Sequence, residues 1–268
     1  MSDGELTLHS KLKRRVVVNC VVETMEPLHV GMGKETLSVS EVDMPVMTDG
    51  RKNPIIPGSS IRGVLRAHVT RLLCSLDEET RNSEFNVRKV KAEDRDIDTF
   101  QNAKSQKEKM EIFGEKMGVI DKLFGVSGYA SPLRITDAIP NIDIDLADRT
   151  HVKIDNDLDR AVEGALFDVQ FVPEKKQFEF KMVFDELNDH ITLDVSNVFY
   201  KLILKQLANG LEIFLGGMKS RGYGLTTIKA KQVLAYTPKQ LALGEKPNPV
   251  TDINQFIDET LRGDNQKG

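Results

Sequence analysis

Residues 14–25 read Arg-Arg-Val-Val-Val-Asn-Cys-Val-Val-Glu-Thr-Met, and this stretch decides the fold. Its valines form a nearly continuous β-branched run, which is typical of a strand buried on both faces at the centre of a sheet. The segment that follows, 26–58, is irregular and rich in Gly, Pro and Met. A connection of that length inside a compact domain is usually functional or disordered.

Two helices are predicted around this strand. Apolar residues recur at helical spacing over 61–76, where Ser59 or Ser60 is expected to cap the first turn, and again over 193–208, which Asn209-Gly210 should end. Strands are expected at four further places: 133–139, 165–172, 178–184 and 225–234. The second and third of these alternate with period two across a short turn, so a hairpin is predicted there.

This order of elements favours an α+β fold with a ferredoxin-like, RNA-recognition-like core over a doubly wound parallel sheet. We expect one domain over 11–240, interrupted by a charged helical insertion at 77–118, followed by a polar surface tail over 241–268 with a short helix near 252–262.

Composition narrows the class of protein. The chain has 268 residues, 40% of them hydrophobic, which is enough for a substantial core. Cys20 and Cys74 fit neither a disulfide framework nor a zinc site and are expected to be buried, reduced thiols. No apolar run approaches the roughly 20 residues of a membrane span, and no signal region is present. A cytoplasmic protein without membrane contact is therefore expected.

Charge is distributed unevenly. The net charge is −4, yet the segments 50–76 and 213–244 contain no acidic residue and several cations each. Acids gather over 143–159 instead. An acidic chain with two such segments can still present one basic groove to a nucleic acid.

The second acid-free segment contains the stretch 216–224, Gly-Gly-Met-Lys-Ser-Arg-Gly-Tyr-Gly, here called the glycine loop. Glycines let a ligand approach bare N–H groups, Lys219 and Arg221 supply positive charge, and Tyr223 offers a ring for stacking. The combination suits a ligand made of phosphates and bases. A flexible turn is the alternative.

The first acid-free segment contains a Gly-Ser turn at 57–60 that opens a helix, with Arg62 and Arg66 one turn apart. Helix N-termini attract anions, so a phosphate site is one interpretation, and an ordinary capped helix is the other. His29, next to the glycines of 31–33, could bind a phosphate or ribose. The sequence has no P-loop, HExxH or GxSxG pattern, and no metal site is predicted.

Together these pieces resemble the repeat-associated mysterious protein (RAMP) superfamily of CRISPR systems, and within it the backbone subunit of type III effector complexes. The stretches that carry the resemblance are Leu28–Gly31, Asp43–Val46, Ile55–Gly63, Leu123–Gly125, Leu133–Ala138 and the glycine loop. Residues 152–155 and 164–167 are most similar to the type III-D branch.

The resemblance implies a subunit that binds guide RNA (crRNA) and presents it to target RNA, in a filament of copies of itself together with other effector subunits. It also implies a thumb over 141–164 that wedges between bases. The wedge residues would be Ile142, Ile144, Val152 and Ile154, and a partly buried β-excursion is the alternative. The implied RNA-binding residues are His29, Gly31, Lys34, Ser59, Ser60, Arg62, Arg66, Gly217, Lys219, Ser220, Arg221, Gly222 and Tyr223.

One departure affects activity. Many members of the family cut target RNA with an aspartate in the loop after the histidine, and Lys34 stands at that place here, with Glu35 beside it. A lysine cannot hold Mg²⁺, so Glu35 is the only catalytic candidate. Three functions stay open: guide-RNA binding, Mg²⁺-dependent cleavage of RNA, and a scaffold that mainly binds proteins.

Overall fold

The computed structural model describes residues 11–31, 42–155, 160–187, 193–247 and 249–265. At its centre, strand β1 (Leu12–Thr24) lies between β6 (Gln177–Leu187) and β8 (Leu225–Tyr236) and is antiparallel to both. The strand order is β2-β6-β1-β8-β7, with β2 at Leu133–Ile135 and β7 at Leu211–Phe214, and β3 (Ile139–Pro140) also pairs with β6. The predicted central strand is confirmed.

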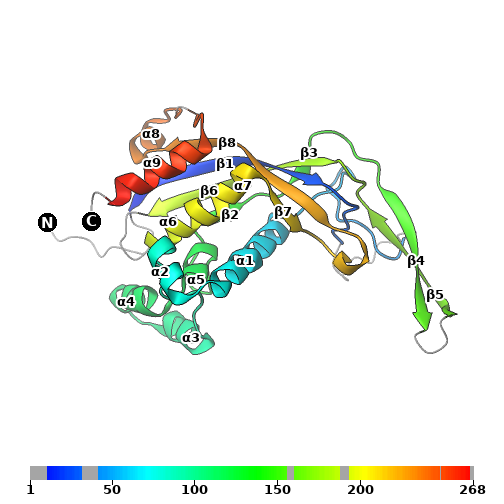
Figure 1. Cartoon of the computed structure of the whole chain (residues 1–268), viewed down its shortest axis with the longest axis horizontal. Helices are drawn as coiled ribbons and strands as arrows, with labels where there is room; N and C mark the ends of the chain where they lie inside the picture. The colour runs from blue at the N-terminus through cyan, green and yellow to red at the C-terminus, as the bar shows by residue number, and fades with distance from the viewer. Residues whose placement is uncertain (1–10, 32–41, 156–159, 188–192, 248, 266–268) are drawn as a thin grey trace.

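Helices cover one face of this sheet (Figure 1). Helix α1 spans Gly58–Ser75. A second helix consists of α6 (Leu193–Asn197), a π-helical turn (Val198–Leu204) and α7 (Lys205–Asn209), and it ends at Gly210, whose φ of 90° needs no Cβ. Both helices and the stop at Gly210 agree with the predictions. The fold is α+β, as expected.

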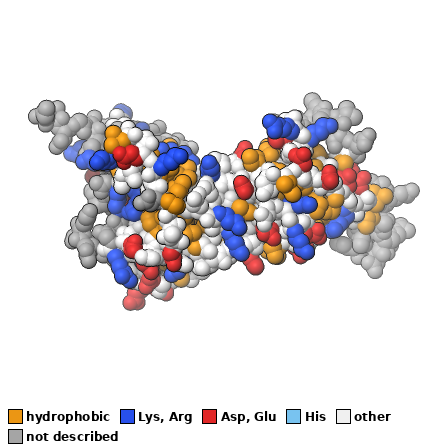
Figure 2. Space-filling view, turned by 90° about the horizontal axis from the view of Figure 1, so that it is seen from above, with side chains coloured by type: hydrophobic (Ala, Val, Ile, Leu, Met, Phe, Trp, Pro, Cys, Tyr) orange, Lys and Arg blue, Asp and Glu red, His pale blue; other side chains and the backbone are white. Residues whose placement is uncertain are grey.

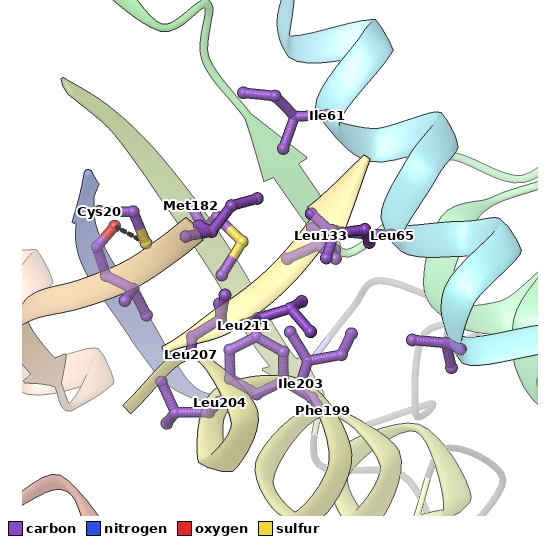
Figure 3. Close-up of a cluster of buried hydrophobic side chains, with 14 of the residues drawn as sticks. Cys20, Ile61, Leu65, Leu133, Met182, Phe199, Ile203, Leu204, Leu207 and Leu211 are labelled. Atoms are coloured by element: carbon purple, nitrogen blue, oxygen red, sulfur yellow. Dashed lines mark hydrogen bonds between the residues drawn. The ribbon is translucent and has the colours of Figure 1, made fainter. Parts of the chain in front are cut away.

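The core lies between the sheet and these helices (Figure 3). Val16, Val18, Cys20 and Val22 point into it from alternate positions of β1. Burial raises the pKa of the Cys20 thiol to about 12, so this cysteine is inert at neutral pH. Cys74 is exposed near the end of α1, so the prediction that both thiols are buried is wrong for that residue.

The segment 77–118 contains three helices, α2 (Glu78–Phe85), α3 (Asp94–Asn102) and α4 (Gln106–Lys116), and α5 (Val119–Phe124) follows. They have a small core of their own, in which the Phe113 ring centre lies 4.4 Å from that of Tyr129. The bounds of an insertion and of a single domain stay predictions.

Strands β4 (Ala147–Asp155) and β5 (Arg160–Phe171) form a separate two-stranded sheet, the β4–β5 hairpin, which projects from the end opposite α3 (Figure 1). The predicted hairpin between 165–172 and 178–184 is therefore wrong. Both of these strands exist, but β6 already pairs with β1 along one edge and with β2 and β3 along the other. No edge of β6 is left for β5.

The C-terminal region contains α8 (Pro238–Leu243) and α9 (Ile253–Asn265). Helix α9 is not the polar surface segment that its composition predicts, since Ile257 is 3% exposed and the Phe256 ring packs edge-on against Tyr200. Its apolar stripe closes the core beside α7. Among the helices of the described ranges, none is long and apolar enough to cross a membrane.

Candidate nucleic-acid interface

The glycine loop is anchored to the segment after β1. The Gly217 and Gly224 N–H groups donate to the carbonyls of His29 (2.8 Å) and Pro27 (2.7 Å). Gly216 has a φ of 71°, and a Cβ there would lie 2.2 Å from the His29 carbonyl oxygen. The N–H of Gly217 is thus occupied, contrary to the prediction of a bare donor. Gly216 serves close backbone approach.

Two predicted RNA-binding rings are buried. Tyr223 is 0% exposed and packs against Phe171 and Val169 of β5, so the prediction that it stacks on a base is wrong. His29 is 3% exposed, and its Nδ1 lies 2.7 Å from the Gln170 carbonyl, which accepts the hydrogen bond. Both side chains join the glycine loop region to the β4–β5 hairpin instead of facing a ligand.

A cavity of about 530 Å³ lies between α1 and the glycine loop, and we call it the α1 groove. Helix α1 contributes His68 and Arg71, and the glycine loop contributes Lys219 and Ser220. Within the described ranges neither Arg71 nor Lys219 has an ion-pair partner. The two acid-free segments therefore lie side by side. They meet through Arg71, which the list of predicted RNA-binding residues missed although it belongs to the first segment.

The beginning of α1 is different from its prediction. The helix starts at Gly58 with Pro57 as N-cap, and no side chain caps it, so the assignment of Ser59 or Ser60 as cap is wrong. The Gly58 N–H donates to the Asp137 carboxylate (2.8 Å), and a Cβ on Gly58 would lie 2.4 Å from the Ile135 carbonyl oxygen. A protein carboxylate already occupies the position predicted for a phosphate.

The two arginines of the first turns have different environments. Arg66 lies 3.4 Å from the fully buried carboxylate of Asp121, so part of its charge is already balanced. Burial, together with the charge of Arg66, lowers the pKa of Arg62 below its ordinary value. In the part of the chain that the structure describes, Arg62 has no hydrogen-bond or ion-pair partner. Of the two, Arg62 is therefore better able to accept an anion.

The predicted wedge residues of the thumb are divided by burial. Ile144 is 6% exposed and belongs to the core, so its assignment to the wedge is wrong. Ile142 is 64% exposed and Val152 is 45% exposed. Val152 pairs across the β4–β5 hairpin with Leu166, which is 67% exposed and was not predicted. The backbone of Ile154 lies in β4, and its side chain is outside the described residues.

Charges alternate on the face seen in Figure 2, where Lys and Arg are interspersed with Asp and Glu around a shallow saddle. This face therefore shows no single basic tract. The candidate interface is the α1 groove and its continuation along the glycine loop. Of the other predicted residues, Gly31 and Gly222 are exposed and lie near it along the chain.

The candidate catalytic loop cannot be placed. Lys34 and Glu35 lie outside the described residues, and within the described ranges no group of three His, Cys, Asp or Glu side chains could hold a metal ion. Asp43 has a structural role here, since its carboxylate accepts the Asp168 N–H (2.9 Å) and Met44 bridges to Val169 of β5.

Comparisons with known proteins agree with this architecture. The chain is 25% identical over 262 residues to "CRISPR system Cms endoribonuclease Csm3" of Methanocaldococcus jannaschii, covering 92% of this chain and 94% of that protein. The protein of the same name from Streptococcus thermophilus is 28% identical over 211 residues, covering 74% of this chain and 79% of the relative.

Among solved structures, a chain of the type III-B Cmr-beta complex in the apo state superposes with a TM-score of 0.51 at 15% identity, covering 80% of this chain and 97% of that one. A chain of the same complex bound to cognate target RNA gives 0.52 at 15% identity, covering 80% and 96%. At this identity the likeness shows the fold. The sequence model of the RAMP superfamily matches residues 21–227, most of the chain, and the protein therefore belongs to the RAMP superfamily.

Proposed function

We propose that this protein is a backbone subunit of a type III CRISPR effector complex, which binds crRNA and presents it for pairing with target RNA. Its partners are then crRNA, target RNA, other effector subunits and further copies of itself in a filament. The Csm3 relatives and the Cmr-beta structures, one of them bound to target RNA, support this class of function. The type III-D branch stays a prediction.

The observation that carries the proposal is the α1 groove. Arg71 and Lys219 come from acid-free segments that lie about 150 residues apart in sequence, and both line the same cavity. Backbone and cationic contacts hold phosphates without reading bases. A subunit that leaves sequence recognition to base pairing needs a surface of this kind.

The test is the salt dependence of RNA binding. The full chain is titrated against a fluorescein-labelled, 24-nucleotide single-stranded oligouridylate, and fluorescence anisotropy gives Kd at several salt concentrations. If the groove neutralises phosphates, log Kd should rise with log salt with a slope of about 0.7 per phosphate contact. Arg71→Gln with Lys219→Gln should weaken binding about tenfold and lower that slope by about one.

The matched control is Arg95→Gln with Arg262→Gln, which removes the same charge from exposed positions on α3 and α9, away from the β4–β5 hairpin (Figure 1). Binding by this control should equal that of the parent protein. Absence of RNA binding at low salt, or an affinity that does not change with salt, contradicts the proposed function.

Cleavage of target RNA is a second candidate, because both Csm3 relatives carry the name endoribonuclease. Glu35 is the residue proposed to act, with Mg²⁺ as the ion that a carboxylate there could hold. The assembled complex would be incubated with complementary RNA and Mg²⁺, with a Glu35→Ala complex in parallel. Regularly spaced products that disappear in the variant support this activity, and an intact target excludes it.

A further inference from the structure

The root of the β4–β5 hairpin carries a group of side chains that the proposed function does not use. Strand alternation places Arg149, His151, Phe167, Val169 and Phe171 on one face of the hairpin, where Arg149 is paired with Val169 and His151 with Phe167. This face meets the glycine loop through Tyr223.

The arginines on this surface are exposed and stacked on aromatic rings. The Arg149 guanidinium carbon lies 5.3 Å from the ring centre of Phe171 and 5.5 Å from that of Tyr223. That of Arg221 lies 5.8 Å from the ring centre of Phe167. Stacking through the planar face leaves the N–H edges of a guanidinium available for an oxygen acceptor, which suits bidentate binding of phosphate.

Neither arginine has an acidic partner in the described ranges. The acids of the hairpin strands, Asp148 and Asp168, alternate onto the opposite face, where the Thr150 hydroxyl donates to the Asp168 carboxylate (2.6 Å). Two guanidinium groups that stand near each other without a carboxylate have unfavourable charge repulsion, which a bound anion would offset.

A histidine lies between the two charges. The His151 Nε2 is 2.9 Å from the Tyr223 hydroxyl, and its ring stacks on Phe167 with the ring centres 5.5 Å apart. Burial lowers the pKa of His151, and the charges of Arg221 and then Arg149 lower it further. Both guanidinium groups are thus close enough to act on the same imidazole.

We infer that Arg149 and Arg221, arranged around the His151–Tyr223 pair, form a binding site for one phosphodiester group of RNA at the root of the β4–β5 hairpin. This inference rests on the proposed function. Arg221 and Lys219 belong to one 3₁₀ turn, with Lys219 in the α1 groove and Arg221 at the hairpin. A strand that leaves the groove therefore meets this site next, and Tyr223 acts as a positioning residue that holds the hairpin against the loop.

The experiment compares Arg149→Gln with Arg221→Gln against the control pair on α3 and α9, with the same 24-nucleotide oligouridylate. The hairpin variant should bind about tenfold more weakly and lose about one from the salt slope. Lysine at both positions should restore the slope, because both charges return. Equal affinity of the hairpin variant and the control, while the parent protein binds RNA, overturns the site but not the proposed function.

A second measurement reports the site directly. His151 is one of five histidines, and its ring Cε1–H resonance is assigned by its loss in His151→Gln. Adding the oligouridylate to the parent protein should shift this resonance, because an anion beside the two arginines changes the field at the imidazole. The shift should be absent in the hairpin variant. A resonance in the parent protein that stays unchanged at saturating RNA overturns the inference.

Discussion

Replacing Gly216 with alanine is expected to destabilise the protein by at least about 3 kcal/mol. The residue has a φ of 71°, and a Cβ would lie 2.2 Å from the His29 carbonyl oxygen and 3.0 Å from its carbonyl carbon. Backbone cannot move aside as a flexible side chain can. The glycine loop would separate from the segment at 27–29, so RNA affinity should fall together with the midpoint of urea-induced unfolding.

Gly222→Ala is the matched control for that substitution. Gly222 is in the same loop with a φ of 78°, yet a Cβ there meets no atom within 4 Å. Only the cost of a left-handed conformation applies, about 1 kcal/mol. An unfolding midpoint for Gly216→Ala no lower than that for Gly222→Ala contradicts the argument from close backbone approach.

The central strand could be predicted because its environment leaves few alternatives. A run such as Val16–Val18 has no polar face to expose, so it must be covered on both sides and paired on both edges. The helix after Gly58 and the stop at Gly210 follow from equally local signals. Local signals also exist for α8, where Thr237 and Gln240 form a capping box, but composition alone favoured a tail there.

The partners of each strand could not be predicted, since pairing depends on which edges other segments have filled. Residues 165–172 and 178–184 have the alternation of a hairpin, yet β6 takes β1, β2 and β3 as neighbours. The fate of Tyr223 depends on Phe171 and Val169, about 50 residues away, which bury it. In the same way, Asp137 occupies the N-terminus of α1 from a segment distant in sequence.

The candidate site shows which part of a charge pattern survives folding. The sequence indicated that two acid-free segments converge, and they do, through Arg71 and Lys219. It could not indicate which cations would remain unpaired, because Arg66 finds Asp121 only in three dimensions. Cations that keep no acidic partner, such as Arg149 and Arg221, are the ones still able to take a phosphate.

A buried carboxylate connects the sheet to the C-terminal helix. Glu186 of β6 is 1% exposed and accepts from Lys13 Nζ (2.9 Å), Arg14 Nε (3.0 Å) and the Tyr200 hydroxyl (2.7 Å). Arg14 also donates to the Thr260 hydroxyl of α9 (3.0 Å) and lies over the Phe256 ring. The charge of Glu186 therefore holds the guanidinium that α9 packs against.

Glu186→Gln is expected to destabilise the protein by about 3 kcal/mol, because two cations lose the anion that offsets their burial. The side chains of Lys13 and Arg14 are 32% and 21% exposed, so water relieves part of the cost and the value lies at the low end of the range for broken buried pairs. Urea-induced unfolding measures the change, and limited proteolysis between α8 and α9 should become faster as α9 detaches. Glu179→Gln, the same change at an exposed position of β6, should leave both unchanged. If both variants unfold at the same urea concentration, α9 is held by its apolar contacts alone and the buried carboxylate is not needed for docking.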